Sequence, residues 1–128
     1  MTAPEQPLVL LVEDDTAFRR SVTAYLEDSG FAVLEADDGL AALELLDQHS
    51  PHIIISDLRM PRMSGLELLE VLQQRPNSAP VIMISGTADK VLLAETTLSG
   101  AAAYLTKPIA DLATLETMAR SLIGELSP

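Results

Sequence analysis

Ile53-Ile54-Ile55-Ser56-Asp57 is the stretch of this sequence that decides the fold. An apolar run without alternation indicates a strand buried on both faces of a sheet, which is typical of parallel sheets. The sequence therefore predicts a parallel strand, buried on both faces, whose carboxyl end presents Asp57.

Three further apolar runs end on residues with useful chemistry. They are 8–12 before Glu13-Asp14-Asp15, 81–84 before Ser85, and 101–106 before Lys107-Pro108. Parallel strands end at one edge of their sheet, and open α/β sheets bind ligands at that edge. We therefore expect carboxylates, a hydroxyl and an ammonium group to gather at one place.

Stretches of helical periodicity separate these runs. Ser64 and Glu67 have the spacing of a capping box at the start of one such helix, and Gly30 is placed to end another. The predicted strands are 8–12, 31–36, 52–57, 80–85 and 102–106, and the predicted helices are 15–29, 38–48, 65–74, 88–99 and 111–126. Strict alternation predicts one doubly wound α/β domain with helices on both faces of the sheet.

Composition sets limits on organisation and partners. The 128 residues are 48% hydrophobic, lack cysteine and carry a net charge of −11, so we expect one ordered domain that does not bind nucleic acid directly. Residues 1–7 read as a loose lead-in, and 8–126 as the domain. We expect no membrane span and a cytoplasmic location. After Pro128 the sequence leaves open a natural end or a boundary before another domain.

The three aspartates Asp14, Asp15 and Asp57 predict a metal site. Carboxylates at one strand edge repel one another, and a hard divalent cation such as Mg²⁺ relieves that repulsion. A strand-end aspartate beside such a cation is also able to act as a nucleophile toward phosphorus. Lys107 would supply positive charge to a transferring phosphoryl group, and Ser85 would donate a hydrogen bond to it.

Each of these residues also has a purely structural alternative. Asp15 stands before a predicted helix and is suited to be its N-cap alone. Asp57 has the place of a turn aspartate, and Ser85 before Gly86 has the place of a turn serine. Lysines such as Lys107 are mostly solvated surface residues. The joint placement of these residues at strand ends favours the functional reading.

Four segments resemble one known family. They are Val12 to Asp15, Asp57 to Gly65, Ser85-Gly86 and Tyr104 to Pro108. With them, residues 8–126 resemble the response-regulator receiver domain, the CheY-like phosphoacceptor module of two-component signalling. The resemblance implies a flavodoxin-like fold with a five-stranded sheet in the order 2-1-3-4-5.

The resemblance implies a role for each residue at the metal and phosphoryl site. Asp57 would be phosphorylated by a histidine kinase, a phosphotransfer protein or acetyl phosphate. Asp15 would bind Mg²⁺ or Mn²⁺ directly, Asp14 directly or through water, and Arg59 through its backbone carbonyl. Lys107 would pair with the phosphoryl group.

The resemblance also implies a switch. Ser85 would move toward the phosphoryl group, Tyr104 would be buried or exposed according to that move, and a cis peptide bond would join Lys107 to Pro108. The output face would be formed by the fourth helix, the last strand and the last helix, and would contact an output domain, a protein partner or a second copy. On this face we expect Leu92 or Leu93 to be exposed.

A finer resemblance concerns 25–31 and 107–112, which are similar to receivers of the RssB type, adaptors that deliver a stationary-phase sigma factor to a protease. In either case the chain is expected to be a signalling module that catalyses its own phosphorylation and dephosphorylation, not an enzyme of metabolism.

Two other classes remain open. A haloacid-dehalogenase-type phosphatase also uses a strand-end aspartate and Mg²⁺, but it requires a second aspartate where this chain has Arg59. The other class is an interaction module that has kept the fold and lost phosphorylation, against which the intact set of site residues argues.

Overall fold

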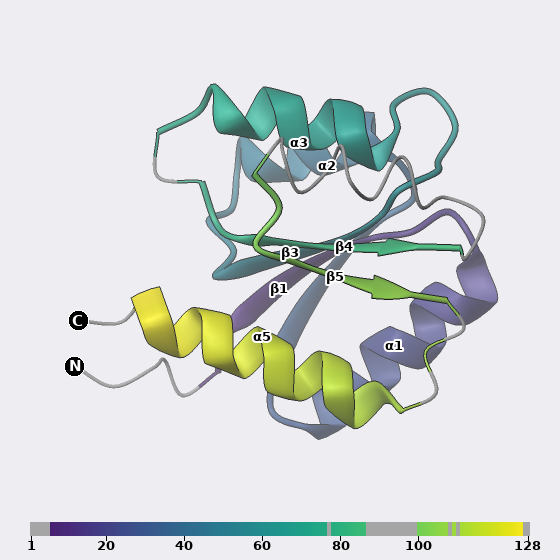
Figure 1. Cartoon of the computed structure of the whole chain (residues 1–128), viewed down its shortest axis with the longest axis vertical. Coiled ribbons are helices and arrows are strands. Elements are labelled where there is room, and N and C mark those ends of the chain that lie inside the picture. The colour runs from purple at the N-terminus through teal and green to yellow at the C-terminus, as the bar shows by residue number, and fades with distance from the viewer. Residues whose placement is uncertain (1–5, 77, 87–99, 108, 110, 127–128) are drawn as a thin grey trace.

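The sheet has the predicted topology. The structure is a computed structural model that describes residues 6–76, 78–86, 100–107, 109 and 111–126 (Figure 1). Its strands are β1 (Leu8–Val12), β2 (Ala32–Ala36), β3 (Ile53–Asp57), β4 (Val81–Ser85) and β5 (Ala103–Thr106). They are parallel and lie in the order β2-β1-β3-β4-β5. The predicted fold class and strand order are therefore confirmed.

The described helices cover both faces of this sheet. They are α1 (Thr16–Asp28), α2 (Gly39–Leu46), α3 (Gly65–Gln73) and α5 (Leu112–Leu126). Figure 1 shows α1 and α5 on one face and α2 and α3 on the other. The helix predicted at 88–99, and with it the expected exposure of Leu92 or Leu93, lies outside the described residues. None of the described helices is long and apolar enough to cross a membrane.

Side-chain alternation along the strands divides the core into two layers. In β1, Val9 and Leu11 belong to the layer with the buried residues of α1 and α5, whereas Leu10 and Val12 belong to the layer with those of α2 and α3. The central strands β3 and β4 are buried at all of their positions. β5 alternates between half-buried and exposed residues, as expected of an edge strand. The site residues at the strand ends therefore rest on a rigid base.

Polar caps fix where the helices begin. Asp38 Oδ1 accepts a hydrogen bond of 2.9 Å from the backbone N–H of Ala41 and caps α2. Ser64 and Glu67 form the predicted capping box at the start of α3. Gly30, with a φ of 100°, follows the C-terminal end of α1 in a conformation that glycine adopts without strain.

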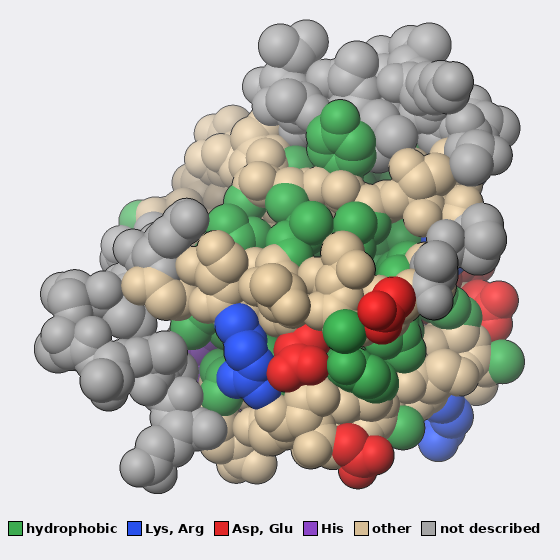
Figure 2. Space-filling model, turned by 60° about the horizontal axis from the view of Figure 1, so that its bottom comes forward, with side chains coloured by type: hydrophobic (Ala, Val, Ile, Leu, Met, Phe, Trp, Pro, Cys, Tyr) green, Lys and Arg blue, Asp and Glu red, His purple; other side chains and the backbone are tan. Residues whose placement is uncertain are grey.

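A polar clasp joins α5 to the end of α1. Glu116 Oε1 accepts hydrogen bonds of 3.2 Å from the Tyr25 hydroxyl and 3.3 Å from the Ser29 hydroxyl, and Glu116 Oε2 pairs with Arg120 Nε at 2.9 Å. The Arg120 guanidinium also lies over the Phe31 ring at 4.5 Å. Figure 2 turns this side of the molecule toward the reader and shows acidic and basic side chains beside exposed hydrophobic ones.

Replacing Glu116 by glutamine should lower the free energy of unfolding by about 1 kcal/mol at pH 7, because a charged acceptor with several donors is lost. The hydrogen bond from Arg120 holds the pKa of Glu116 below its ordinary value. The contribution of the carboxylate is therefore present above pH 4.5 and is lost as the pH falls through the lowered pKa. In urea titrations, the free energies of unfolding of the parent and of Glu116→Gln should become equal in acid. Glu70→Gln, at an exposed position of α3, is the matched control, and an equal loss in both variants would contradict the role of the clasp.

Candidate functional site

Asp57 stands at the carboxyl end of the central strand β3 and is 8% exposed. Its Oδ1 atom accepts a hydrogen bond of 3.0 Å from the backbone N–H of Leu58. Its Oδ2 atom lies 3.4 Å from Lys107 Nζ. One carboxylate oxygen is thus held by the backbone, and the other faces a positive charge.

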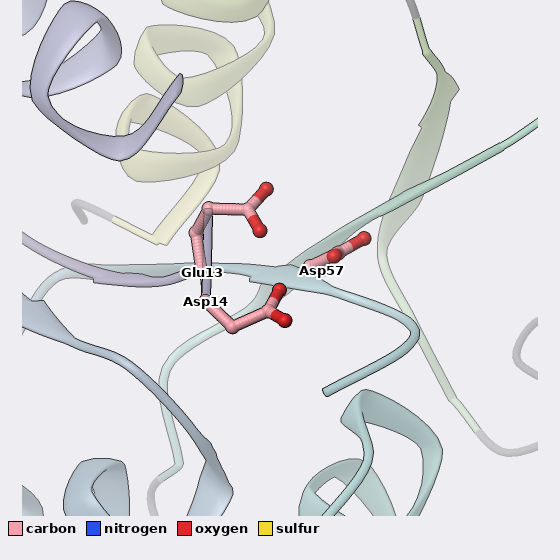
Figure 3. A group of neighbouring side chains, drawn as sticks. All are labelled: Glu13, Asp14 and Asp57. Carbon is pink, nitrogen blue, oxygen red and sulfur yellow. The ribbon is translucent and has the colours of Figure 1, made fainter. Parts of the chain in front are cut away.

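Glu13 and Asp14 follow β1 and bring two more carboxylates to Asp57. One ligand atom from each of the three residues lies within 4.8 Å of those of the other two. Figure 3 shows that Glu13 and Asp14 leave the chain on opposite sides, Glu13 toward α1 and α5 and Asp14 toward α2 and α3. Glu13 is 1% exposed, and Asp14 is exposed. This cluster therefore straddles the edge of the sheet.

Asp15 is not a member of this cluster, although we predicted it as a direct metal ligand. Its Oδ1 atom accepts a hydrogen bond of 3.1 Å from the backbone N–H of Phe18 and caps α1. Asp15 therefore makes the N-cap contact that we gave as its structural alternative, and Glu13, not Asp15, lies in the cluster with Asp14 and Asp57. A signal for Glu13 was available in the sequence, because it is the first residue after a fully apolar strand and shares the side of Val9 and Leu11.

Lys107 connects the cluster to β4 and β5. Its Nζ atom lies 2.6 Å from Glu13 Oε1 and 4.7 Å from the centroid of the Phe18 ring. Its backbone N–H donates a hydrogen bond of 2.6 Å to the carbonyl of Ser85. Burial lowers the pKa of Lys107, but the hydrogen bond that Lys107 donates to Glu13 and the charges of Asp57 and Glu13 outweigh burial and raise the pKa overall. Lys107 is thus held as a cation.

The two buried carboxyl groups are short of positive charge. Burial raises the pKa of Glu13 to about 7, against the opposing effect of its hydrogen bond with Lys107. Burial also raises the pKa of Asp57, although Lys107 acts in the other direction. One lysine does not compensate three carboxyl groups, and hard oxygen donors in such a cluster are the ligands that Mg²⁺ prefers. The donor set therefore fits a divalent cation.

The remaining predicted site residues belong to β4, to β5 and to the segment after β3. Ser85 ends β4 and is 1% exposed, and its hydroxyl donates a hydrogen bond of 3.4 Å to the carbonyl of Gly86. Tyr104 in β5 is 49% exposed. Arg59 is exposed, two residues beyond Asp57. Pro108, and with it the predicted cis peptide bond, lies outside the described residues.

The two histidines are remote from the cluster. His49 and His52 are exposed and precede β3, at the opposite end of this strand from Asp57. His52 Nδ1 accepts a hydrogen bond of 2.9 Å from the backbone N–H of Leu8, and so extends the pairing of β1 with β3. Their place favours a structural role over metal binding.

Sequence comparison identifies relatives of this chain. Residues 9–120 match the model of the response regulator receiver domain. The chain is 39% identical over 117 residues to the Regulator of RpoS of Escherichia coli K12. The matched residues make up 88% of this chain and 35% of that protein. It is 38% identical over 119 residues to the transcriptional regulatory protein FixJ of Azorhizobium caulinodans, covering 93% of this chain and 56% of that protein. The chain thus spans between about a third and a little over half of the length of these two relatives.

Solved structures share the fold. The receiver domain of the Francisella response regulator 1452 has a TM-score of 0.87 at 29% identity, covering 94% of this chain and 98% of that one. Full-length FixJ from B. japonicum has a TM-score of 0.89 at 31% identity, covering 98% of this chain and 61% of that one. With its matching sheet, acidic cluster and sequence, the chain belongs to the family of response regulator receiver domains.

Proposed function

We propose that this chain is a phosphoacceptor switch in which Asp57 receives a phosphoryl group from a phosphohistidine of a kinase or phosphotransfer protein, or from acetyl phosphate. The observation that carries the proposal is the position of Asp57 Oδ2, which faces Lys107 while Asp57 Oδ1 is bonded to the backbone. The Oδ2 atom is therefore the oxygen placed to attack phosphorus.

The transfer makes one bond and breaks one. Asp57 Oδ2 forms an O–P bond, the P–N bond of the phosphohistidine breaks, and the imidazole nitrogen keeps the bonding electron pair. The Lys107 ammonium stabilises the negative charge that moves across the phosphoryl oxygens. Attack requires the ionised form of Asp57. Burial raises the pKa of this carboxyl group, and Lys107 acts to lower it. Lys107 thus serves both the nucleophile and the transferred group.

Glu13, Asp14 and Asp57 would hold Mg²⁺ or Mn²⁺, together with the backbone carbonyl of Arg59. When bound, the cation supplies charge that neutralises the carboxylates and polarises a phosphoryl oxygen. This assignment replaces the direct role expected of Asp15, because the Asp15 carboxylate caps α1.

Phosphorylation would bias a two-state change at β5 and α5. Ser85 is the hydroxyl that would turn from the Gly86 carbonyl toward the phosphoryl group, and Tyr104 would change its exposure with that move. A shallow hollow of about 540 Å³ is lined by Ala103 of β5, by Asp111 and by residues of α5. This face would contact an output domain, a protein partner or a second copy. A cytoplasmic location is part of the same proposal.

The test is incubation of the 128-residue chain with acetyl phosphate and Mg²⁺, followed by intact-mass measurement. We expect the mass to increase by one phosphoryl group in the parent and in Asp47→Ala, which removes an exposed aspartate outside the site. Asp57→Ala should show no increase. Equal modification of Asp57→Ala and the parent would contradict the proposal.

A second candidate is an adaptor role in regulated sigma-factor proteolysis, exerted through protein contact. The 39% identity with the Regulator of RpoS favours it. Binding of purified RpoS to the chain, measured by fluorescence anisotropy with and without acetyl phosphate, tests this role. If the chain binds RpoS no more tightly than it binds an unrelated sigma factor, the adaptor role is contradicted.

A further inference from the structure

The loop after Asp57, residues 58–64, is fastened at its base and at its tip. At the base, the backbone N–H of Gly65 donates a hydrogen bond of 2.9 Å to the carbonyl of Leu58. Leu58 also donates its N–H to the Asp57 carboxylate at 3.0 Å. At the tip, the backbone N–H of Gly39, at the start of α2, donates a hydrogen bond of 3.3 Å to the carbonyl of Met63. The tip of the loop is thereby attached to another helix.

An ion pair strengthens the attachment at the tip. Arg62 Nε donates a hydrogen bond to Asp38 Oδ2, while Asp38 Oδ1 accepts from the N–H of Ala41. The side chain of Asp38 is 4% exposed and that of Arg62 is 59% exposed. Asp38 is therefore a buried carboxylate with both oxygens engaged, and Arg62 is the cation that the structure gives it.

Arg62 adopts an unfavourable backbone conformation in this position. Its φ is 63°, and among the described residues it is the only one other than glycine with a positive φ. The left-handed region is costly for a residue with a Cβ atom. Without the ion pair, the loop would relax toward other backbone conformations. The side-chain contact therefore maintains a backbone geometry that the local sequence disfavours.

We propose that Asp38 and Arg62 are positioning residues of the phosphoryl-transfer site. By holding the tip of the 58–64 loop against α2, they fix the backbone that runs from Asp57 past Arg59. The affinity of the site for the divalent cation then depends on an ion pair whose side chains are not ligands. This inference rests on the proposed function and adds two residues to it.

The test compares Mg²⁺ affinity by isothermal titration calorimetry of the 128-residue chain, at a temperature where every variant is folded. Arg62→Ala and Asp38→Asn should each raise the Kd for Mg²⁺ about 10-fold, as is typical when a residue that supports a metal site is lost. Arg62→Lys should recover part of the affinity. Arg75→Ala is the matched control, because it removes an arginine that pairs with Asp47 at 3.8 Å beyond the other end of α3, and it should leave the Kd unchanged.

Arg62→Gly separates positioning from general stability. Glycine relieves the backbone strain, so this variant should unfold at a higher urea concentration than Arg62→Ala. It still lacks the ion pair, and its Mg²⁺ affinity should remain as weak as that of Arg62→Ala. In the metal-free protein, the amide protons of Gly39 and Gly65 should exchange faster in Arg62→Ala than in Arg75→Ala.

Three outcomes would overturn the inference. If the parent binds Mg²⁺ and Arg62→Ala binds as tightly as Arg75→Ala, the positioning role fails and the proposed function stands. If Mg²⁺ affinity follows unfolding stability across all the variants, the ion pair acts on folding alone. A parent chain that binds no Mg²⁺ overturns the proposed function, and this inference with it.

Discussion

Replacing Gly65 by alanine should lower the free energy of unfolding by about 3 kcal/mol, at the upper end of the usual effect of overpacking. A Cβ atom at this position would lie 2.2 Å from the backbone carbonyl oxygen of Asp57 and 2.9 Å from Met83 Sδ. The first of these neighbours is backbone of the central strand, which cannot move aside as a flexible side chain can. Relief of the contact would displace either α3 or Asp57, the residue that we propose as the phosphoryl acceptor.

Urea denaturation measures the loss, and intact mass after acetyl phosphate treatment measures the accompanying fall in phosphorylation of Asp57. Gly124→Ala is a matched control, because an added Cβ atom in α5 meets nothing within 4 Å. Alanine has the higher helix propensity, so this control should gain up to about 1 kcal/mol. If both alanines change stability in the same direction, the close approach of α3 to Asp57 is not what requires glycine at position 65.

Replacing Lys107 by alanine should lower the rate of Asp57 phosphorylation roughly 100-fold, the usual loss when one preorganised stabiliser of the transition state is removed. Its ammonium lies 3.4 Å from Asp57 Oδ2 and 2.6 Å from Glu13 Oε1. Without it, Glu13 and Asp57 would face each other with no lysine between them, which further disfavours the ionised nucleophile.

The measurement is the initial rate with acetyl phosphate at saturating Mg²⁺. Lys107→Arg keeps the charge in a side chain of different shape, so its initial rate should lie between those of the parent and Lys107→Ala. Arg75→Ala removes the same charge at the other end of the sheet and should keep the parental rate. A rate for Lys107→Ala close to that of the parent would show that the lysine serves folding rather than transfer.

The sequence predicted the fold well because each strand had an independent signal. Buried parallel strands appear as continuous apolar runs, and β3 and β4 end within the predicted stretches at Asp57 and Ser85. Asp57 and Lys107 were expected to meet because strand ends share one edge, and the structure brings them together. Their chemical roles are a matter for the experiments above.

The acidic cluster was predicted less well, because the three consecutive acidic residues 13–15 offer three possible pairs. Sequence distance does not show that Asp15 caps α1 and that the buried Glu13 carboxylate contacts Lys107. The Asp38–Arg62 pair was also missed, since it joins residues 24 positions apart through a backbone conformation that is rare for arginine. The Asp38–Arg62 contact depends on tertiary packing and leaves no periodic signal.

The opposite directions of Glu13 and Asp14 have a thermodynamic consequence. Each residue extends from the strand side that belongs to a different hydrophobic layer. A cation bound by both would cross-link the two layers at their common edge, and the free energy of binding would become part of the free energy of folding. At a concentration 100 times its Kd, a ligand adds about 2.7 kcal/mol to stability. The magnesium concentration would then set how firmly the two halves of the core are held together, even before any phosphoryl group arrives.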